Sequence, residues 1–504
     1  MTRAFLALAC VTTVALATAA AAGAEPAGFR TSVPAMLTPA KAGVTVEPII
    51  SVGDTLKSGY MFEAIPDGIA VVGHGRGRAD VYVNHETSTV PFPFTPATGV
   101  GFNDFTNAML SNLKMNVQTH GVLAGSYVIP SEANYQRFCS NFLVSEEHGF
   151  ERDLILTNEE ATDVVNRIGT AWPATPANGS QPEQAGVVVA YDVKSGAYKS
   201  IYGMGRHNHE NSVGIPGYGH PVVLSGDDTF TAPSSQLYLY TAANGAAVWN
   251  DTGTLWAFKS DVATVNDYSD MTVGGAVSGR FIEVPRAVAV GDQTALENWS
   301  NANGVFQFIR LEDIAYDRTT PNVVYMADTG EPRALPGPGA AYMTRGPAGT
   351  QGPFPNGRLF KLVLNPSAPT RATLSIAHDA DAGGYRNPMA IHNLDNLEST
   401  KRSVFIQEDT GSHNQGMTNS RIWRYDIATG ATEVVAEVDQ SLVPSSPKGA
   451  WESSGIVDVS DVFGHDTFLV DVQAGTLIVD EEIRGTLTYQ REGGQLLLVK
   501  IPGA

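Results

Sequence analysis

Residues 187–202 read VVVAYDVKSGAYKSIY, and this stretch decides the fold that we expect. Two apolar runs flank the turn Tyr191-Asp192-Val193-Lys194-Ser195-Gly196. The aspartate can accept bonds from the amides that follow it and the glycine can take a positive φ, so the two runs close into an antiparallel hairpin. Residues 422–438, IWRYDIATGATEVVAEV, repeat the pattern. The sequence therefore predicts this hairpin as a repeating unit.

Further short strands are expected along the whole chain, at residues 80–84, 236–241, 253–260, 322–328, 357–364, 403–408, 466–472 and 495–501. The best candidates for helices are residues 103–114 and 159–165. Many short strands separated by irregular loops favour a β-propeller over a two-sheet sandwich. We expect an all-β fold, a propeller of six blades with few short helices, in which loop residues from several blades converge on a central channel.

The composition agrees with such a fold. Charged residues make up 17% of the chain, whereas it contains 51 glycines and 29 prolines. Low charge with many turn formers favours strands and loops over helices. Stretches rich in Pro, Gly, Ala and Thr near residues 87–101, 171–184 and 334–355 predict long surface loops.

The N-terminus has the pattern of an export signal. Met1-Thr2-Arg3 is a short positive start, and an apolar run with small residues follows over residues 4–22. We expect a signal peptide over residues 1–24 and a single propeller domain over residues 25–504. The twin arginine of the alternative export route is missing, which favours Sec-type export to the periplasm or the medium. Anchoring as a lipoprotein through Cys10 is the weaker alternative.

Charge and hydropathy exclude two classes of partner. The net charge of −20 argues against nucleic acid. No long apolar stretch follows the signal, so we expect no membrane span. No obligate protein partner is evident from the sequence.

One cysteine, Cys139, remains once the signal is removed, and it has no disulfide partner. Exported proteins rarely keep a free thiol, because thiols oxidise outside the cytosol. We expect Cys139 to be either sealed in the core or a metal ligand.

Five clusters place an acid at the end of a strand. They are Asn84-His85-Glu86, Thr157-Asn158-Glu159-Glu160, His209-Glu210-Asn211, Arg310-Leu311-Glu312-Asp313 and Gln407-Glu408-Asp409. One such cluster is usually a solvated loop carboxylate. Five of them around one propeller mouth would repel each other without cations, and carboxylates are suitable ligands for Ca²⁺. Because neighbouring residues of a strand face opposite ways, His207 and His209 should face away from Glu210.

Other known signatures are missing: the sequence has no Gly-x-Ser-x-Gly elbow, P-loop, His-Glu-x-x-His helix or EF-hand loop. The acids near Asp227, Glu452 and Asp458 favour turn caps over ligands.

Taken together, the ordered motifs resemble the PhoX-type alkaline phosphatase family. The resemblance spans most of the mature chain, from Val83-Asn84-His85-Glu86 through Arg137-Phe138-Cys139-Ser140 to Asp471-Val472-Gln473. It implies a secreted propeller that hydrolyses small phosphate monoesters with iron and calcium. It further implies that Glu86, Cys139, Glu210 and Glu312 bind metal and that Arg310 grips the phosphate. The resemblance gives Glu159, Glu160, Asp313, Glu408, Asp409 and Asp471 calcium-binding or supporting roles.

Two departures from the family keep alternatives open. Ser140-Asn141-Phe142-Leu143 follows the cysteine where the family has a glycine pair and a tryptophan, and the twin arginine is missing. The alternatives are an esterase acting on a phosphodiester, phytate or lactone, and a non-catalytic calcium-binding propeller.

Overall fold

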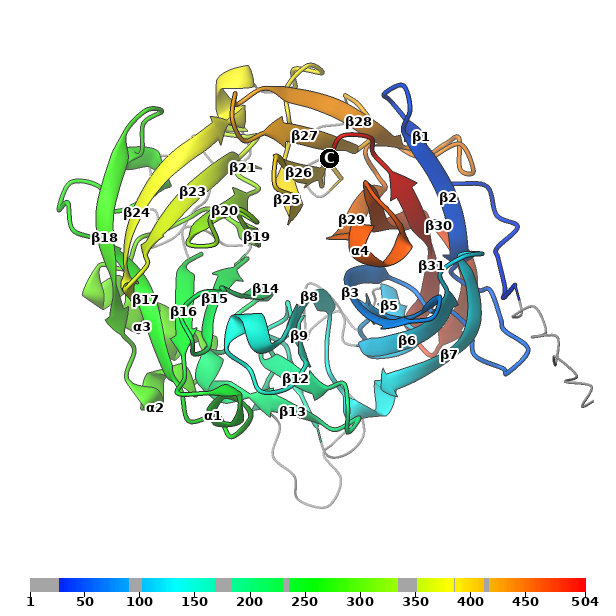
Figure 1. The fold of residues 1–504 in the computed structure, drawn as a ribbon, viewed down its shortest axis with the longest axis horizontal. Coiled ribbons are helices and arrows are strands. Elements are labelled where there is room, and N and C mark those ends of the chain that lie inside the picture. Colours follow the sequence, from blue (N-terminus) through cyan, green and yellow to red (C-terminus); the bar gives the residue numbers. More distant parts are fainter. Residues whose placement is uncertain are drawn as a thin grey trace, which may run out of the picture.

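The computed structural model describes residues 27–89, 102–167, 183–229, 235–333, 351–384, 386–411 and 417–504. The predicted signal peptide and most of the three predicted long loops lie outside these residues. Within them, antiparallel sheets form six blades that are arranged in a ring (Figure 1). The predicted propeller is confirmed.

The six blades follow each other along the chain, and each begins with its innermost strand. Blade 1 contains β3 (Pro66–Gly75), β4 (Arg78–His85), β6 (Met109–Asn116) and β7 (Gly121–Ile129); blade 2 contains β8 (Phe138–Val144), β9 (Leu154–Glu159), β12 (Val188–Asp192) and β13 (Tyr198–Ile201). Blade 3 contains β14 (His209–Gly214), β15 (Val222–Asp227), β16 (Leu237–Thr241) and β17 (Thr254–Ser260); blade 4 contains β19 (Leu311–Tyr316), β20 (Val323–Asp328), β23 (Arg358–Asn365) and β24 (Ala368–Asp379). Blade 5 contains β25 (Leu394–Ser399), β26 (Ser403–Glu408), β27 (Arg421–Asp426) and β28 (Thr432–Val438); blade 6 contains β29 (Glu452–Asp458), β30 (Thr467–Arg484) and β31 (Leu487–Lys500).

Additional strands connect the blades or extend them. Strand β18 (Ala276–Glu283) pairs with β17 and β24, so blades 3 and 4 share one nine-stranded sheet. Strand β5 (Phe102–Asp104) runs parallel to β31. Two-stranded ladders in loops are formed by β10 (Val164–Val165) with β11 (Glu183–Gln184) and by β21 (Glu331–Arg333) with β22 (Gln351–Phe354).

The N-terminal segment closes the ring. Strand β1 (Leu37–Pro39) pairs with β28 of blade 5, and β2 (Thr45–Ser51) becomes the outermost strand of blade 6 by pairing with β31. Figure 1 shows these two strands in blue beside the last strands of the chain in orange and red. Main-chain pairing therefore joins residues 37–51 to blades 5 and 6.

The core is divided among the interfaces between blades. In β15, Val222 and Leu224 belong to the apolar cluster shared with blade 4, while Val223 belongs to the cluster shared with blade 2. In β9, Leu154 and Ile155 likewise face different neighbouring blades. Both faces of each inner blade strand are buried, which explains why these strands are continuous apolar runs in the sequence.

The hairpin turns form as the sequence predicts. Asp192 accepts hydrogen bonds from the backbone amides of Lys194 (2.9 Å) and Ser195 (3.1 Å), and Gly196 has φ +72°. Asp426 and Gly430 repeat this turn between β27 and β28, where Gly430 also has φ +72°.

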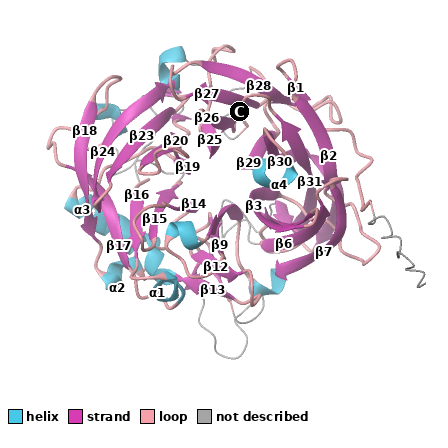
Figure 2. Cartoon of the chain, in the orientation of Figure 1, coloured by secondary structure: helices cyan, strands magenta, loops and turns pink. Residues whose placement is uncertain are grey.

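Helices are few and short, as Figure 2 shows. The described residues contain α1 (Gly245–Trp249), α2 (Arg286–Ala289), α3 (Gln293–Asn303) and α4 (Ser460–Phe463), with 3₁₀ turns at Ser131–Ala133, Glu146–His148, Tyr202–Met204, Tyr268–Asp270 and Ala380–Gly383. Among the helices in this part of the chain, none has the length and apolar character needed to cross a membrane.

Both candidate helices from the sequence are wrong. Residues 103–114 lie mainly in β5 and β6, and residues 159–165 contain the end of β9 and the short β10. The error at β6 has a physical cause: neighbouring residues on both faces of this strand are buried, so its apolar pattern does not alternate.

Candidate metal centre

Residues at the start of the innermost strands line one cavity. In β3 the register steps from the pair Pro66 and His85 to the pair Ile69 and Val83, so Asp67 and Gly68 lie opposite Asn84 alone. Strands β8, β14, β19 and β25 carry the same bulge after their first residue. A bulge re-aims the side chains next to it. The second residue of each strand lines the cavity, namely Asp67, Cys139, Glu210, Glu312 and Asp395.

The sixth innermost strand, β29 (Glu452–Asp458), carries its bulge after its third residue. Ser454 pairs with Asp471 and Ile456 with Val470, so Gly455 is the one extra residue. Gly455 has φ +54°, and a Cβ atom there would lie 2.5 Å from the carbonyl oxygen of Asp67. Only glycine permits this approach of β29 to β3. Glu452 and Ser454 of β29 also line the cavity.

A second set of cavity residues comes from the ends of the neighbouring strands. Glu86, Glu160 and Asp409 directly follow β4, β9 and β26, and all three line the cavity. Gln473 of β30 lines it from blade 6. Neighbouring strands of a blade are antiparallel, so the start of one and the end of the next meet on the same side of the ring.

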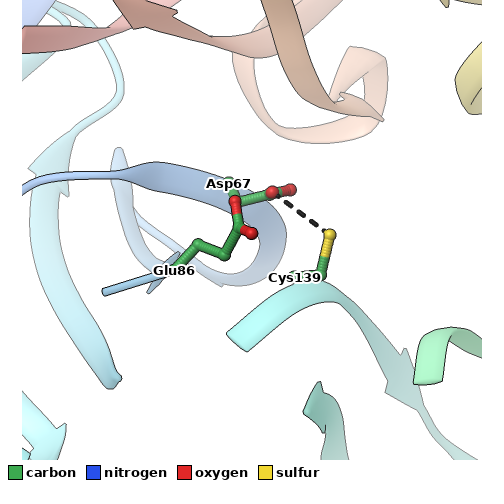
Figure 3. A group of neighbouring side chains, drawn as sticks. All are labelled: Asp67, Glu86 and Cys139. Carbon is green, nitrogen blue, oxygen red and sulfur yellow. Dashed lines mark hydrogen bonds between the residues drawn. The ribbon is translucent and has the colours of Figure 1, made fainter. Parts of the chain in front are cut away.

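The cavity has a volume of about 200 Å³. Its lining contains one thiol, eight carboxylates and the guanidinium groups of Arg137 and Arg310. Four overlapping groups have ligand atoms within 4.8 Å of one another: Asp67, Glu86 and Cys139; Cys139, Glu160 and Glu210; Glu210, Glu312 and Asp395; and Asp395, Asp409 and Glu452. Figure 3 shows the first group, in which three side chains from two blades converge.

Cys139 faces these carboxylates and is not enclosed by apolar side chains alone. Its Sγ atom lies 3.0 Å from Oε1 of Glu210 and 3.3 Å from Oδ2 of Asp67. The thiol is therefore at the junction of the first two groups, which is where a metal ligand would have to lie.

The negative charge of the cavity carboxylates must be balanced by positive groups or by protons. Burial, followed by the charge of Glu86, raises the pKa of Asp67 to about 8. Burial also raises the pKa of Cys139 well above its usual value, and the charges of Asp67 and Glu210 add to this. Burial likewise raises the pKa of Glu160, Glu210, Glu312, Asp395 and Glu452 well above the usual range. Two guanidinium groups are too few to balance eight carboxylates, so the set needs protons or bound cations.

The donor atoms fit metal ions. Oδ1 of Asp67 and Oε2 of Glu452 are buried and make no hydrogen bond to the described residues. Carboxylate oxygens suit a hard cation such as Ca²⁺, whereas a thiolate favours a transition metal. The groups that include Cys139 therefore fit a transition metal, and the oxygen-only groups fit calcium.

Arg310 is held firmly beside the cavity. Its Nε and Nη2 atoms donate to the two carboxylate oxygens of Asp228 at 2.7 and 2.6 Å, and Nη2 lies 2.9 Å from Oε1 of Glu312. A two-point contact of this kind fixes the plane of the guanidinium. Arg137 lies beside Glu86, with 3.9 Å between Nη1 of Arg137 and Oε1 of Glu86.

Three acids from the sequence clusters lie outside the cavity lining, and two of them, Glu159 and Glu408, pair with an arginine. The carboxylate of Glu159 accepts hydrogen bonds from both Nη atoms of Arg167, at 2.7 and 2.6 Å, and from the backbone amide of Gln136. The carboxylate of Glu408 similarly binds Arg421 and the backbone amide of His392. Each acid thus ties the end of the second strand to the loop before the innermost strand.

Asp313 and Asp471 occupy supporting positions. Asp313 accepts hydrogen bonds from the backbone amides of Ile314 and Leu397 and faces a separate cavity farther along the channel. Asp471 is fully buried, and neither of its carboxylate oxygens has a hydrogen-bond partner among the described residues. Burial and the nearby charge of Asp67 raise the pKa of Asp471 well above its usual value.

The two histidines of the Gly205 to Asn211 segment face away from Glu210, as the sequence indicates. Nδ1 of His209 lies 2.8 Å from Oγ of Ser225, and its ring contacts that of His207, with 3.6 Å between centroids and an interplanar angle of 34°. Neither histidine lines the cavity.

Sequence reasoning missed Asp67, Arg137, Asp395 and Gln473 and treated Glu452 as a turn cap. A signal for two of them was present. Pro66-Asp67-Gly68-Ile69 and Leu394-Asp395-Asn396-Leu397 share with Leu311-Glu312-Asp313-Ile314 an acid that follows the first residue of an innermost strand. The prediction that the acids lie at strand ends is wrong for Glu210 and Glu312, which lie at strand starts.

Comparison with known proteins identifies similar folds. No model of a known protein family matches the sequence, and no curated protein matches it. Among solved structures, PhoX of Pseudomonas fluorescens in complex with vanadate, a transition state analogue, has a TM-score of 0.62 at 16% identity, covering 94% of this chain and 98% of PhoX.

Two further solved structures are more distant. A protein of unknown function from Dyadobacter fermentans has a TM-score of 0.42 at 9% identity, covering 91% of this chain and 100% of its own. The NanB sialidase of Streptococcus pneumoniae has a TM-score of 0.41 at 7% identity, covering 90% of this chain and 70% of its own. The likeness to PhoX supports the propeller fold, and the other two structures add nothing to that argument.

Proposed function

We propose that this chain is a metal-dependent phosphatase that hydrolyses phosphate monoesters in the cavity at the channel mouth. The observation that carries the proposal is the convergence of one thiol, eight carboxylates and two guanidinium groups in a single cavity. Its support from comparison is the similar fold of PhoX, which was solved with vanadate.

The residues divide between two kinds of metal ion. Asp67, Glu86, Cys139, Glu160 and Glu210 would hold iron, because their two groups share the thiol. Glu312, Asp395, Asp409 and Glu452 would hold calcium together with Glu210. When bound, these ions would act as Lewis acids that neutralise phosphate oxygens and make an oxygen nucleophile available near neutral pH.

Neighbouring polar groups orient the ligands. Nε2 of Gln473 donates to Oδ2 of Asp67 at 2.9 Å and to Oε2 of Glu86 at 3.2 Å. Oγ1 of Thr329 donates to Oε1 of Glu312 at 2.7 Å. Such contacts fix the directions in which carboxylates present their oxygens.

Arg310 would bind the phosphoryl group. Its contact with Asp228 holds the guanidinium beside the cavity, so little side-chain entropy is lost when a substrate binds. The positive charge would stabilise the oxygens of the transferring group.

The test is an assay of the native exported protein. With iron and calcium present we expect hydrolysis of an aryl phosphate or a nucleotide, and we expect elemental analysis to find both metals. Protein that contains the metals but is inert on these substrates over a wide pH range would contradict the proposal.

A second candidate is supported by the group of Asp395, Asp409 and Glu452, which contains only oxygen donors. A calcium-binding propeller without iron would need no thiol ligand. Such a protein would be a non-catalytic binding module or an esterase for another substrate. Elemental analysis that finds calcium without iron would support this second candidate. An assay with a panel that includes a phosphodiester, phytate and a lactone would then distinguish the esterase from the binding module.

We also propose that the protein is exported to the periplasm or the medium. The signal pattern of residues 1–24 lies outside the described residues. Detection of the mature N-terminus near Glu25 in periplasm or medium would support this proposal, whereas a retained cytosolic precursor would contradict it.

A further inference from the structure

The blades repeat a short pattern just before their innermost strands. Arg137, Asn208, Arg310 and Asn393 directly precede β8, β14, β19 and β25. The carbonyl oxygen of each accepts a hydrogen bond from the residue that follows the second strand of the same blade, with donors Glu160, Asp228, Thr329 and Asp409 at 2.9, 3.0, 3.0 and 2.9 Å. The four residues therefore occupy equivalent positions in blades 2 to 5.

Arginine and asparagine alternate at these positions. The two asparagine side chains are directed to backbone, because Nδ2 of Asn208 donates to the carbonyl of Asp228 and Nδ2 of Asn393 donates to that of Thr329. The two arginines line the cavity instead. Strand β14, which carries Glu210, lies between β8 and β19. Arg137 and Arg310 thus lie on either side of the blade that supplies Glu210.

Each arginine lies beside the acid of the preceding blade, but the two contacts differ. Arg310 binds Asp228 at two points, at 2.7 and 2.6 Å, whereas Arg137 is 3.9 Å from Glu86. Asp228 belongs to none of the four candidate metal groups, whereas Glu86 is grouped with Asp67 and Cys139. Glu86, the acid beside Arg137, is therefore also a candidate metal ligand.

The backbone of Arg137 is unusual. Its φ is +44°, in a region that non-glycine residues other than asparagine and aspartate seldom adopt. The conformation is held by hydrogen bonds from its own amide to Thr87 and from Glu160 to its carbonyl. Strained backbone of this kind is often retained where it positions a functional side chain.

We propose that Arg137 is a second substrate-binding residue, which binds the phosphoryl group from the side of blade 2 while Arg310 binds it from the side of blade 4. The proposal rests on the phosphatase function proposed above and extends it. A phosphoryl group carries charge on three equatorial oxygens, and a planar guanidinium can contact two of them. Two guanidinium groups would favour a terminal phosphate monoester, which offers all three oxygens, over a diester.

The test uses Arg137→Asn in the native, metal-containing protein. Asparagine tolerates a positive φ and is the residue found at the equivalent positions of blades 3 and 5, so the variant should fold. We expect the Kd for inorganic phosphate, measured by calorimetry, and the KM for an aryl phosphate each to rise roughly ten- to hundredfold. Arg137→Lys, which keeps the charge but loses the planar fork, should show a smaller loss.

The controls separate the possible outcomes. Arg280→Gln removes an exposed arginine that contacts Asp261 on the outer sheet, and it should leave phosphate affinity unchanged. Iron and calcium content of Arg137→Asn should equal that of the wild type; if metal is lost in step with affinity, Arg137 only positions Glu86 and the proposal is overturned. Unchanged phosphate affinity in an active variant also overturns it. Wild-type protein that neither binds phosphate nor hydrolyses monoesters would refute the proposed function itself.

Discussion

At the scale of single residues, neighbours in the chain have different surroundings. Glu159 and Glu160 are adjacent, yet Glu159 is enclosed by Arg167 and backbone amides while Glu160 lines the cavity. Glu408 and Asp409 repeat this division in blade 5. One residue of each pair therefore stabilises the blade through an arginine, and the other faces the cavity.

This division predicts opposite effects for two variants. Arg167→Gln leaves Glu159 as an unpaired buried charge and should cost about 3–5 kcal/mol in the free energy of unfolding. Metal content of the folded fraction should not change. Glu160→Gln should instead reduce metal content and leave stability of the metal-free protein unchanged or higher, because a repelled carboxylate is removed. Denaturant unfolding and elemental analysis of both variants would check this, and equal metal loss in the two would contradict it.

Cys139 supports a second prediction at the same scale. Serine cannot replace a thiolate ligand near neutral pH, because its hydroxyl stays protonated. Cys139→Ser should therefore lose iron and at least about a hundredfold in activity, since each 1.36 kcal/mol of lost transition-state stabilisation is a factor of ten. The loss of packing should cost only about 1 kcal/mol. Retention of iron and activity, measured beside the melting temperature, would show that the thiol is merely buried.

At the scale of elements, the bulges at the start of the innermost strands decide which residues reach the cavity. Without the bulge in β3, the successive residues Pro66, Asp67 and Gly68 would alternate strictly between the two faces of the strand. Close approach of neighbouring strands also depends on small residues, since a Cβ atom on Gly68 would lie 2.3 Å from the backbone nitrogen of Asn141 in β8. The bulges, together with glycines at the points of close approach, therefore allow the innermost strands to pack around the cavity.

Gly455→Ala should therefore damage the cavity more than an ordinary glycine substitution. Its Cβ atom would meet the Asp67 carbonyl at 2.5 Å, forcing β29 away from β3. Gly217 is a matched control, because it has φ +95° and no atom within 4 Å of the added Cβ. We expect Gly217→Ala to cost about 1 kcal/mol and Gly455→Ala to cost more and also to lose metal. Equal unfolding free energies for the two variants would contradict this account.

At the scale of the whole molecule, ring closure brings the carboxylates together. The cavity residues come from all six blades. Strands β1 and β2 pair with the outer strands of blades 5 and 6. Mutual repulsion among buried carboxylates opposes this arrangement, whereas a cation bound between blades would stabilise it.

Metal removal should therefore weaken the whole fold. A ligand that binds only the folded state stabilises it by about 3 kcal/mol at a hundredfold excess over its Kd. Chelation should lower the melting temperature, and added calcium should raise it again while sodium at equal ionic strength should not. A melting temperature that is the same with and without chelator would show that the ring closes without cations.

The sequence by itself determined the strands, the hairpin turns and the propeller class. These features follow from local patterns: continuous apolar runs where both faces of a blade are buried, and Asp and Gly at fixed places in turns. The resemblance to the PhoX-type family also implied five site residues, and all of them line the same cavity: Glu86, Cys139, Glu210, Arg310 and Glu312.

Only the tertiary structure decided which other residues join them. Asp67 and Asp395 lie in ordinary-looking strands, and Glu452 looks like a turn cap, until the bulges and ring closure place them side by side. The structure also separated Glu160 from Glu159. The physical reason is that the direction of a side chain at a bulge and the approach of one blade to the next depend on contacts between residues far apart in the chain, which a local pattern cannot contain.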